Sequence, residues 1–396
     1  MRDPLLIAAS SPSLVMWTSI ILGVAAAQPP VYQINAATHF DAGRQHGQLA
    51  ASRIKGWLET DEMRALLHFA MSTKDGRAAL EALKQNNTRF SPMLAQEVTG
   101  IAEGAGLSVD YLWVATLINE LEALMPTPLD EQRRPGHCSD IYAVPQGGTA
   151  HGIAHGHNED WPGPIKNFWY FLIVNSTASD GQPGLSSCAG MMYPGGLVGW
   201  ASTWNARGLF LTQNSLFPAR SRPYGLASAF AQREAICGSN GAATSLDEVV
   251  AALKAAGAWA QAASINIVDL NHRRMANVER YEGKFGLHEV TMRPWTASNY
   301  SHFNHFKEIG GVPEDGHRNS SAHRQATLDS YTAPQTASDI AMRLSDTSDR
   351  EYPIYRDMTL ATFVLDHRWS LRVWCCGRSA MSGPPDYHWN LSNAFG

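Results

Sequence analysis

The segment HGIAHGHNEDW, residues 151–161, carries three histidines and two acidic residues within a short stretch. Residues 150–157 have the composition of a strand, so the two acids stand where that strand ends. A polar cluster of this density is a metal site, a strand end that faces solvent, or part of a catalytic centre. The fold expected for the chain depends on which of these three hypotheses holds.

A metal site is the first hypothesis. His155-x-His157 followed by acids is similar to part of the H-x-H-x-D-H pattern of binuclear zinc hydrolases. Trp161 stands where that pattern ends in histidine, and the pair that comes nearest to a second ligand group is His302 and His305. The metallohydrolase hypothesis is therefore the less favoured one, while a solvent-facing strand end stays open.

The catalytic hypothesis pairs the cluster with Cys138. A polar stretch, residues 130–137, precedes this cysteine and has the composition of an exposed, cleavable loop. A cut before Cys138 would give its thiol a neighbouring α-amine, whose usual pKa of about 7.7–8.0 suits a base near neutral pH. The remaining parts would be an acid to orient the amine, a cation to favour the thiolate and amides for an oxyanion hole: Asp160, Arg356, Asn214 and Asn304. The alternative is that Cys138 is a buried, small apolar residue.

The sequence before Cys138 has mainly helical patterns, and the sequence after it has mainly strand patterns. Residues 40–124 have apolar residues at helical spacing, and Gly43 and Gly47 lie four apart, a spacing that lets another backbone approach closely. After Cys138, short strand patterns dominate, and helices are expected near 226–236, 246–256 and 337–344. Strand clusters separated by helices predict a layered α+β fold.

Composition excludes several classes of protein. The 396 residues are 44% hydrophobic and only 17% charged, so the chain can form a large core and is no disordered polyelectrolyte. The net charge of −5 gives no basic surface for nucleic acid. Among the 12 tryptophans, Trp161, Trp200 and Trp204 are expected in the core rather than in a pocket.

The N-terminus has the pattern of a signal peptide. An apolar stretch, residues 14–24, precedes three alanines that end at Ala27, and it is short for a stable membrane span. Secretion is the favoured localisation, with a cytoplasmic location as the alternative. Five N-x-S/T sequons agree with a glycoprotein: Asn86, Asn175, Asn299, Asn319 and Asn390. The chain has five cysteines, so at least one cannot pair within the chain. In a secreted protein such a free thiol suggests a functional role.

Five motifs in order resemble the acyl-coenzyme A:6-aminopenicillanic acid acyltransferase family, the C45 peptidases. They are Cys138-Ser139-Asp140, Gly156-His157-Asn158-Glu159-Asp160-Trp161, Asn205-Ala206-Arg207-Gly208-Leu209 through Asn214, His302-Phe303-Asn304-His305-Phe306, and Thr359-Leu360 through Asp366. The resemblance implies an N-terminal-nucleophile hydrolase: a four-layer αββα sandwich preceded by a helical pro-region. It also implies a proenzyme that cleaves itself between His137 and Cys138.

The closest branch in this resemblance is the insect β-alanyl-dopamine hydrolases. Its marks are Gly156-His157-x-Glu159-Asp160, Cys188-Ala189-Gly190, Ser264-Ile265-Asn266 and Asn299-Tyr300 through Phe306. This branch implies hydrolysis of N-β-alanyl amides of biogenic amines, such as β-alanyl-dopamine and carcinine, through a Cys138 thioester. An acidic residue would then pair with the substrate ammonium, and Glu120, Asp140 and Glu159 are the candidates.

The expected organisation is a signal peptide at 1–27, a helical pro-region or α chain at 28–137 and a nucleophile-bearing β chain at 138–396, the two chains forming one globular unit. No cofactor and no metal are expected. The partners are a small amide substrate and the two processed chains, and a homodimer is left open. Three positions depart from the family pattern or match it ambiguously: His137 replaces glycine, Phe303 replaces threonine, and Arg356 fits either of two family arginines. A second function stays open, a non-catalytic secreted binding protein on the same fold.

Overall fold

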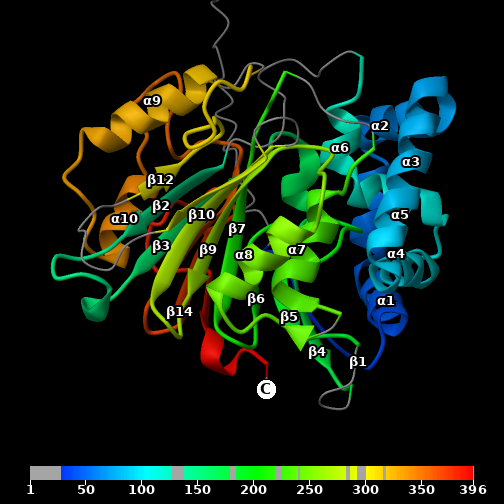
Figure 1. Ribbon diagram of the computed structural model, residues 1–396, viewed down its shortest axis with the longest axis horizontal. Coiled ribbons are helices and arrows are strands. Elements are labelled where there is room, and N and C mark those ends of the chain that lie inside the picture. Colours follow the sequence, from blue (N-terminus) through cyan, green and yellow to red (C-terminus); the bar gives the residue numbers. More distant parts are fainter. Residues whose placement is uncertain are drawn as a thin grey trace, which may run out of the picture.

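The computed structural model describes residues 28–126, 138–178, 184–219, 224–239, 241–281, 286–291, 300–314 and 318–395. Within them, two sheets lie face to face, with helices outside both (Figure 1). The expected signal peptide, residues 1–27, and the expected cleavage residue His137 lie outside the described residues.

The larger sheet has eight strands in the order β1-β4-β5-β6-β7-β9-β10-β11. Its pairs are antiparallel except for β1 and β4, which run parallel. The strands are β1 Val31–Ala36, β4 Tyr170–Ser176, β5 Cys188–Met192, β6 Thr203–Asn205, β7 Leu209–Ser215, β9 Ala263–Asp269, β10 Arg274–Tyr281 and β11 Gly286–Thr291. A short strand, β8 Gly241–Ala242, lies apart from this order.

The smaller sheet has six antiparallel strands in the order β12-β2-β3-β13-β14-β15. Its strands are β2 Ser139–Ala143, β3 Ala154–Asp160, β12 Tyr300–His302, β13 Thr359–Asp366, β14 Ser370–Cys375 and β15 Tyr387–Asn390. Side chains from both inner faces fill the space between the sheets. The Tyr142 hydroxyl of β2, for example, donates to Asn266 Oδ1 of β9 at 2.9 Å, and the Phe171 and Trp389 rings lie 4.9 Å apart.

Helices cover the outer faces of both sheets. Helix α10 Ala337–Leu344 packs on β2, β3 and β13 through Ile340 and Leu344, and α9 Arg318–Asp329 lies beyond β12 (Figure 1). On the other side, α7 Ser228–Cys237 and α8 Leu246–Ala255 cover the larger sheet. The αββα sandwich predicted for this chain is confirmed.

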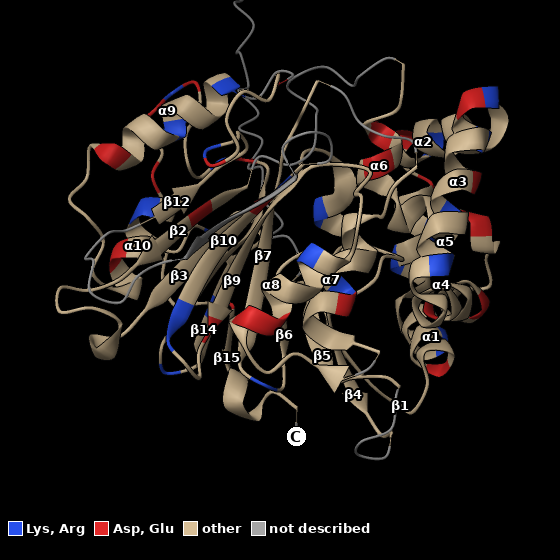
Figure 2. Cartoon of the chain, viewed as in Figure 1, with Lys and Arg blue, Asp and Glu red and all other residues tan. Residues whose placement is uncertain are grey.

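A helical front precedes Cys138, as predicted. It consists of α1 His39–Leu58, α2 Asp61–Ser72, α3 Lys74–Phe90, α4 Pro92–Ala105, α5 Val109–Thr116 and α6 Ile118–Glu122. Lysine, arginine and acidic residues are interspersed on these helices (Figure 2). In the part of the chain that the structure describes, no helix combines the length and the apolar character that a bilayer crossing requires.

Glycines bring α1 and α4 into backbone contact. A Cβ atom on Gly47 would lie 2.8 Å from the backbone nitrogen of Ala105, and one on Gly43 would collide with the Glu97 carbonyl. Helix α4 contributes Gly100 and Gly104 to the same contact, because a Cβ on either residue would meet the α1 backbone. The close approach expected from the spacing of Gly43 and Gly47 is therefore present.

One disulfide joins Cys188 of β5 to Cys237 at the end of α7. Cys138, Cys375 and Cys376 form no disulfide, in agreement with the expectation of at least one thiol outside a disulfide. The sulfur atoms of Cys375 and Cys376 lie 2.9 Å apart, within hydrogen-bond distance.

Helix α9 and strands β1, β5, β8, β11, β12 and β15 were not predicted from the sequence. Helix α9 reads RNSSAHRQATLD and buries Ser320, Ser321 and Arg324 rather than an apolar stripe, so hydrophobic periodicity gives no signal there. Strand β3 begins four residues later than expected and ends at Asp160, because residues 149–151 form a short 3₁₀ turn.

The α1–α4 contact predicts that Gly100→Ala destabilises the protein. The added methyl would lie 2.9 Å from the Arg44 backbone nitrogen, so the helices must move apart at a cost of about 1–3 kcal/mol. Urea denaturation measures this loss. Gly310→Ala is the control, since nothing lies within 4 Å of a Cβ there. Equal stability of both variants would contradict the close packing.

Candidate active site

Cys138 directly precedes β2, the strand between β12 and β3 in the smaller sheet. It is buried, with 3% exposure. The thiol lies at a small pocket of about 10 Å³ lined by Cys138, Glu159, Trp161, Trp200, Ala201, Gln213 and Ser215. Burial, with the nearby Glu159 carboxylate as a second cause, raises the pKa of the Cys138 thiol to about 12. In the uncut chain the thiol is therefore protonated at neutral pH.

Glu159 is the acidic neighbour of this thiol. Cys138 Sγ donates toward Glu159 Oε1 across 3.9 Å, and the Tyr193 hydroxyl donates to the same oxygen at 2.7 Å. The other carboxylate oxygen, Oε2, lies 3.1 Å from His157 Nε2. Alternation along β3 places His157 and Glu159 on one face, and the pairing of Ser139 with Asn158 brings this face beside Cys138.

The hydrogen bonds continue from His157 into the space between the sheets. His157 Nδ1 lies 2.8 Å from Asp140 Oδ2, and His155 Nε2 lies 2.7 Å from Asp140 Oδ1. Thr212 of β7 in the opposite sheet donates to Asp140 Oδ1 at 2.6 Å. All of these side chains are buried, so the hypothesis of a solvent-facing strand end is wrong for this cluster, as is the expectation that His155 and His157 could be exposed.

Charges in this cluster balance one another. Burial raises the pKa of Asp140, but the imidazoles of His157 and His155 outweigh it and hold that pKa well below its usual range. For His157 burial lowers the pKa, while Asp140 outweighs it and keeps the pKa well above the ordinary value. The pair is therefore a carboxylate and an imidazolium, with both ring N–H groups of His157 directed at carboxylates.

A metal would find few free donors here. Sγ of Cys138, a nitrogen of His157 and a carboxylate oxygen of Glu159 lie within 4.8 Å of one another, a spacing that a small cation could bridge. Both nitrogens of His157 already face carboxylates, however, so the protonated ring offers no lone pair. The arrangement fits a hydrogen-bonded network better than it fits the metal site considered from the sequence.

Asp160 follows Glu159 and therefore points to the other face of β3. Its Oδ1 accepts from Thr359 Oγ1 at 2.6 Å, and its Oδ2 lies 3.5 Å from Arg356 Nε. Burial raises the pKa of Asp160 to about 6, and Arg356 offsets part of that rise. Arg356, with an 11% exposed side chain, is a mostly buried partner of Asp160 and not a surface ion pair.

Arg324 is the polar residue that the sequence analysis missed. It reaches in from α9 and is fully buried; its Nη1 donates to the Cys138 carbonyl at 2.7 Å and to Ser139 Oγ at 3.0 Å. Its Nη2 donates to Asn304 Oδ1 at 2.9 Å. The guanidinium thus ties the predicted oxyanion residue Asn304 to the predicted nucleophile. Asn304 Nδ2 in turn donates to the Ser215 carbonyl at 3.0 Å.

Asn214 lies on the inner face of β7. It is two residues beyond Thr212, as Cys138 is two residues before Asp140, so both lie toward the same end of the sandwich. Asn214 Oδ1 accepts from Asn266 Nδ2 at 2.8 Å. Its own Nδ2 is buried and has no hydrogen-bond partner among the described residues. Asn214 is therefore a free amide donor inside the sandwich.

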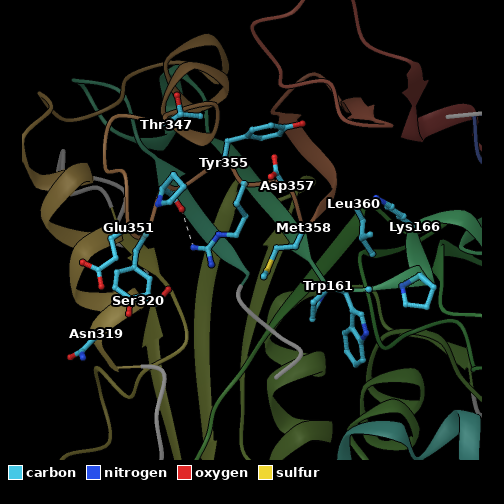
Figure 3. Close-up of a pocket in the computed structure, with 16 residues that line it drawn as sticks. Trp161, Lys166, Asn319, Ser320, Thr347, Glu351, Tyr355, Asp357, Met358 and Leu360 are labelled. Atoms are coloured by element: carbon cyan, nitrogen blue, oxygen red, sulfur yellow. Dashed lines mark hydrogen bonds between the residues drawn. The ribbon is translucent and has the colours of Figure 1, made fainter. Parts of the chain in front are cut away.

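A larger cavity of about 960 Å³ is lined by the residues drawn in Figure 3. Trp161 lines both this cavity and the Cys138 pocket. In the figure, Trp161 and Lys166 lie on the side opposite Glu351 and Ser320, and Arg356 also lines the cavity. Trp161 and Trp200 thus line the thiol pocket, which corrects the expectation that they belong only to the core.

The third expected core tryptophan behaves as predicted. Trp204 is 1% exposed and lies near Trp389 between the sheets, with ring centroids 5.6 Å apart. The Trp204 and Trp389 rings are tilted relative to each other by 38° and are not stacked. Trp204 lines neither the thiol pocket nor the larger cavity.

We expect Arg324→Lys to destabilise the protein by about 2–4 kcal/mol, since one ammonium cannot replace a fork that binds Cys138, Ser139 and Asn304. Urea denaturation measures the loss. The control is Arg318→Lys on the exposed start of the same helix, which should change stability by less than about 0.5 kcal/mol. Similar losses in the two variants would show that the fork has no structural role.

The contact between Glu62 and Trp161 predicts a pH dependence. Glu62 Oε1 accepts from Trp161 Nε1 at 3.0 Å, and burial raises the pKa of Glu62 to about 7. Between about pH 4.5 and 7 the folded chain holds more protons than the unfolded chain, so this group lowers stability as pH rises. Glu62→Gln should therefore raise Tm more at pH 8 than at pH 5. Glu81→Gln, at an exposed residue, should show no such trend; a Glu62→Gln effect independent of pH would refute the prediction.

Comparison with known proteins adds the family. Two solved structures are similar in part: a mutant of the conjugated bile acid hydrolase from Clostridium perfringens, at 13% identity over 60% of this chain and 89% of that chain with a TM-score of 0.36, and penicillin V acylase from Agrobacterium tumefaciens, at 14% identity over 65% and 88% with the same TM-score. The search of curated proteins gave no match.

The sequence model of the acyl-coenzyme A:6-aminopenicillanic acid acyl-transferase family matches residues 147–377. The matched region begins after Cys138 and includes Asp160, Asn214, Asn304, Arg324 and Arg356. Because the match covers more than half of the chain, the predicted family is confirmed: the protein is an enzyme that belongs to the acyl-coenzyme A:6-aminopenicillanic acid acyl-transferase family.

Proposed function

We propose that this protein is a self-processing amidohydrolase or acyltransferase that uses Cys138 as an N-terminal nucleophile on small N-acyl amides. The observation that carries the proposal is the position of Cys138. It directly precedes β2, the second strand of the smaller sheet, and is buried beside Glu159. Its thiol is free and donates toward a buried carboxylate, which suits a shielded nucleophile.

Self-processing is an N-to-S acyl shift. The Cys138 sulfur attacks the carbonyl carbon of His137, the bond from that carbon to the Cys138 nitrogen breaks, and the nitrogen gains a proton to become an α-amine. The product is a thioester between His137 and Cys138. Water then hydrolyses the thioester, which releases the His137 carboxylate and restores the thiol.

Turnover of substrate uses the new α-amine as the base. It takes the thiol proton while sulfur attacks the amide carbon, and it returns the proton to the departing amine. Asn214 Nδ2, a buried donor without a partner among the described residues, and Asn304 Nδ2 are the oxyanion donors in this proposal. Asp160 holds the ammonium form of the amine, and Arg356 fixes Asp160. Water or a second amine resolves the thioester.

The substrate class we propose is N-β-alanyl conjugates of aromatic biogenic amines. The cavity next to Trp161 is lined by the rings of Tyr352 and Tyr355 and by the carboxylates of Glu351 and Asp357. Aromatic walls suit an aromatic amine, and a carboxylate suits the ammonium of a β-alanyl group.

The sequence candidates for that carboxylate are less suitable. Glu120 is buried and accepts from Ser228, and Asp140 is enclosed by two imidazoles, while Glu159 lies against the thiol. Glu351 and Asp357 are therefore the acids that we propose for the substrate ammonium.

Secretion remains part of the proposal. The disulfide between Cys188 and Cys237 supports an oxidising compartment, where such bonds persist. This agrees with the signal-peptide pattern at residues 1–27.

The first test is the intact mass and N-terminal sequence of purified protein. Two chains, the second beginning Cys-Ser-Asp-Ile, are expected for the wild type and for Cys375→Ala, which removes another buried free thiol. Cys138→Ala should remain one chain and lose amide hydrolysis. A single wild-type chain without turnover would instead favour a binding protein, and chelator-sensitive turnover that survives Cys138→Ala would favour a metallohydrolase.

A second test addresses the acyl group. Glu351→Gln and Asp357→Asn should raise KM for a β-alanyl amide by about two- to fivefold, the range of a partly exposed ion pair, and leave KM for the matching acetyl amide unchanged. Steady-state kinetics on both amides measure the difference. Equal effects on the two substrates would refute the assignment of these acids.

A further inference from the structure

Self-cleavage poses a chemical problem that substrate turnover does not. In the uncut chain the Cys138 nitrogen is part of a peptide bond, so it is not a base. The thiol is buried at a pocket of about 10 Å³, and burial raises its pKa to about 12, so it does not ionise there unaided near neutral pH. If the proposed function is correct, another group must take its proton.

We propose that Glu159 is the catalytic base for self-cleavage and that the α-amine of Cys138 replaces it in later turnover. Glu159 Oε1 is the oxygen to which Cys138 Sγ donates, across 3.9 Å, and both side chains are buried. The inference rests on the proposed function and assigns to Glu159 a step that comes before the mature enzyme exists.

The surrounding groups hold this carboxylate in place. The Tyr193 hydroxyl donates to Oε1 at 2.7 Å, and burial raises the pKa of that hydroxyl well above its usual range, so Tyr193 stays a donor. The imidazolium of His157 lies 3.1 Å from Oε2 and is itself fixed by Asp140. A cation on the far oxygen balances the charge of the carboxylate in a closed site.

The other two candidates for the base have no acceptor directed at the thiol, although the His157 ring also contacts Cys138. His157 directs both ring nitrogens at carboxylates, so it has no lone pair for the thiol proton. Asp160 lies on the opposite face of β3, hydrogen-bonded to Thr359. Of the described residues that line the thiol pocket, Glu159 is the one that carries a carboxylate.

The step balances without a further reagent. The Sγ–H bond of Cys138 breaks, its proton moves to Glu159 Oε1, and the sulfur forms a bond to the His137 carbonyl carbon. When the bond from that carbon to the Cys138 nitrogen breaks, Glu159 returns the proton to the nitrogen. Glu159 is then a carboxylate again, and the new α-amine lies on the same residue as the thiol.

The test separates self-cleavage from turnover. Newly synthesised full-length Glu159→Gln is followed by gel electrophoresis and intact mass, and its cleavage should be at least about 10²-fold slower than that of wild type, the usual loss of a general base. Once cut, its turnover per β chain should fall less than about tenfold, because the α-amine then serves as the base. Glu97→Gln is the matched control, a buried glutamate of α4 whose Oε2 lies 2.7 Å from His39 Nδ1 in the helical front; it should cleave at the wild-type rate.

Chemical rescue distinguishes a base from a structural contact. Glu159→Ala should cleave slowly and recover at least about tenfold in cleavage rate when formate is added, because a small carboxylate can occupy the vacated site and accept the thiol proton. This variant also serves if Glu159→Gln does not fold.

Each result has a definite reading. Cleavage of Glu159→Gln at the wild-type rate, or no rescue of folded Glu159→Ala by formate, would overturn the role of Glu159 while the wild type still cuts itself. A wild-type chain that never cleaves would overturn the proposed function and this inference together.

Discussion

The carboxylate of Asp140 is the contact on which the arrangement of the site depends. It lies between the imidazoles of His155 and His157 on the neighbouring strand and accepts from Thr212 of the opposite sheet. A buried charge is tolerated only when it is paired and hydrogen-bonded. Asp140 therefore fixes the register of β2 on β3 and the approach of the two sheets at one point, and that register sets Cys138 beside Glu159.

Enclosure of the thiol follows from this geometry. The strands place Cys138 inward, Trp161 lines its pocket as well as the larger cavity, and Arg324 holds the Cys138 carbonyl. Each of these contacts comes from a different part of the chain, so the site exists only in the assembled sandwich. A reactive cysteine that is shielded in this way is also protected from oxidation once the fold is complete.

Much of the architecture could be predicted from the sequence, because it rests on local patterns. Strand patterns predicted most of the strands after Cys138, helical spacing predicted the front, and helices α7, α8 and α10 lie where they were expected. Motif resemblance placed Cys138, Asp160 and Arg356 in one neighbourhood, and the structure brings Arg356 within 3.5 Å of Asp160.

What could not be predicted depends on partners that are distant in sequence. From the sequence alone, His155 and His157 are expected to be polar, exposed residues. Only the register of β2 on β3 shows that both can be buried as partners of Asp140. Arg324 reads as a surface residue of a polar helix, since nothing local shows that its acceptors are the carbonyl of Cys138 and the amide of Asn304. Glu159 was considered for substrate binding, because the sequence gives no sign that its oxygen faces the thiol.

Strand β1 determines whether the two products of a cut before Cys138 would stay together. Its residues 31–36 precede the cut, while its parallel partner β4 follows it, and the glycine contact between α1 and α4 lies wholly before it. The disulfide joins two cysteines that both follow it. The two products would be held together by a shared sheet without a covalent link, so a cut there would change the chemistry of Cys138 and leave the two chains associated.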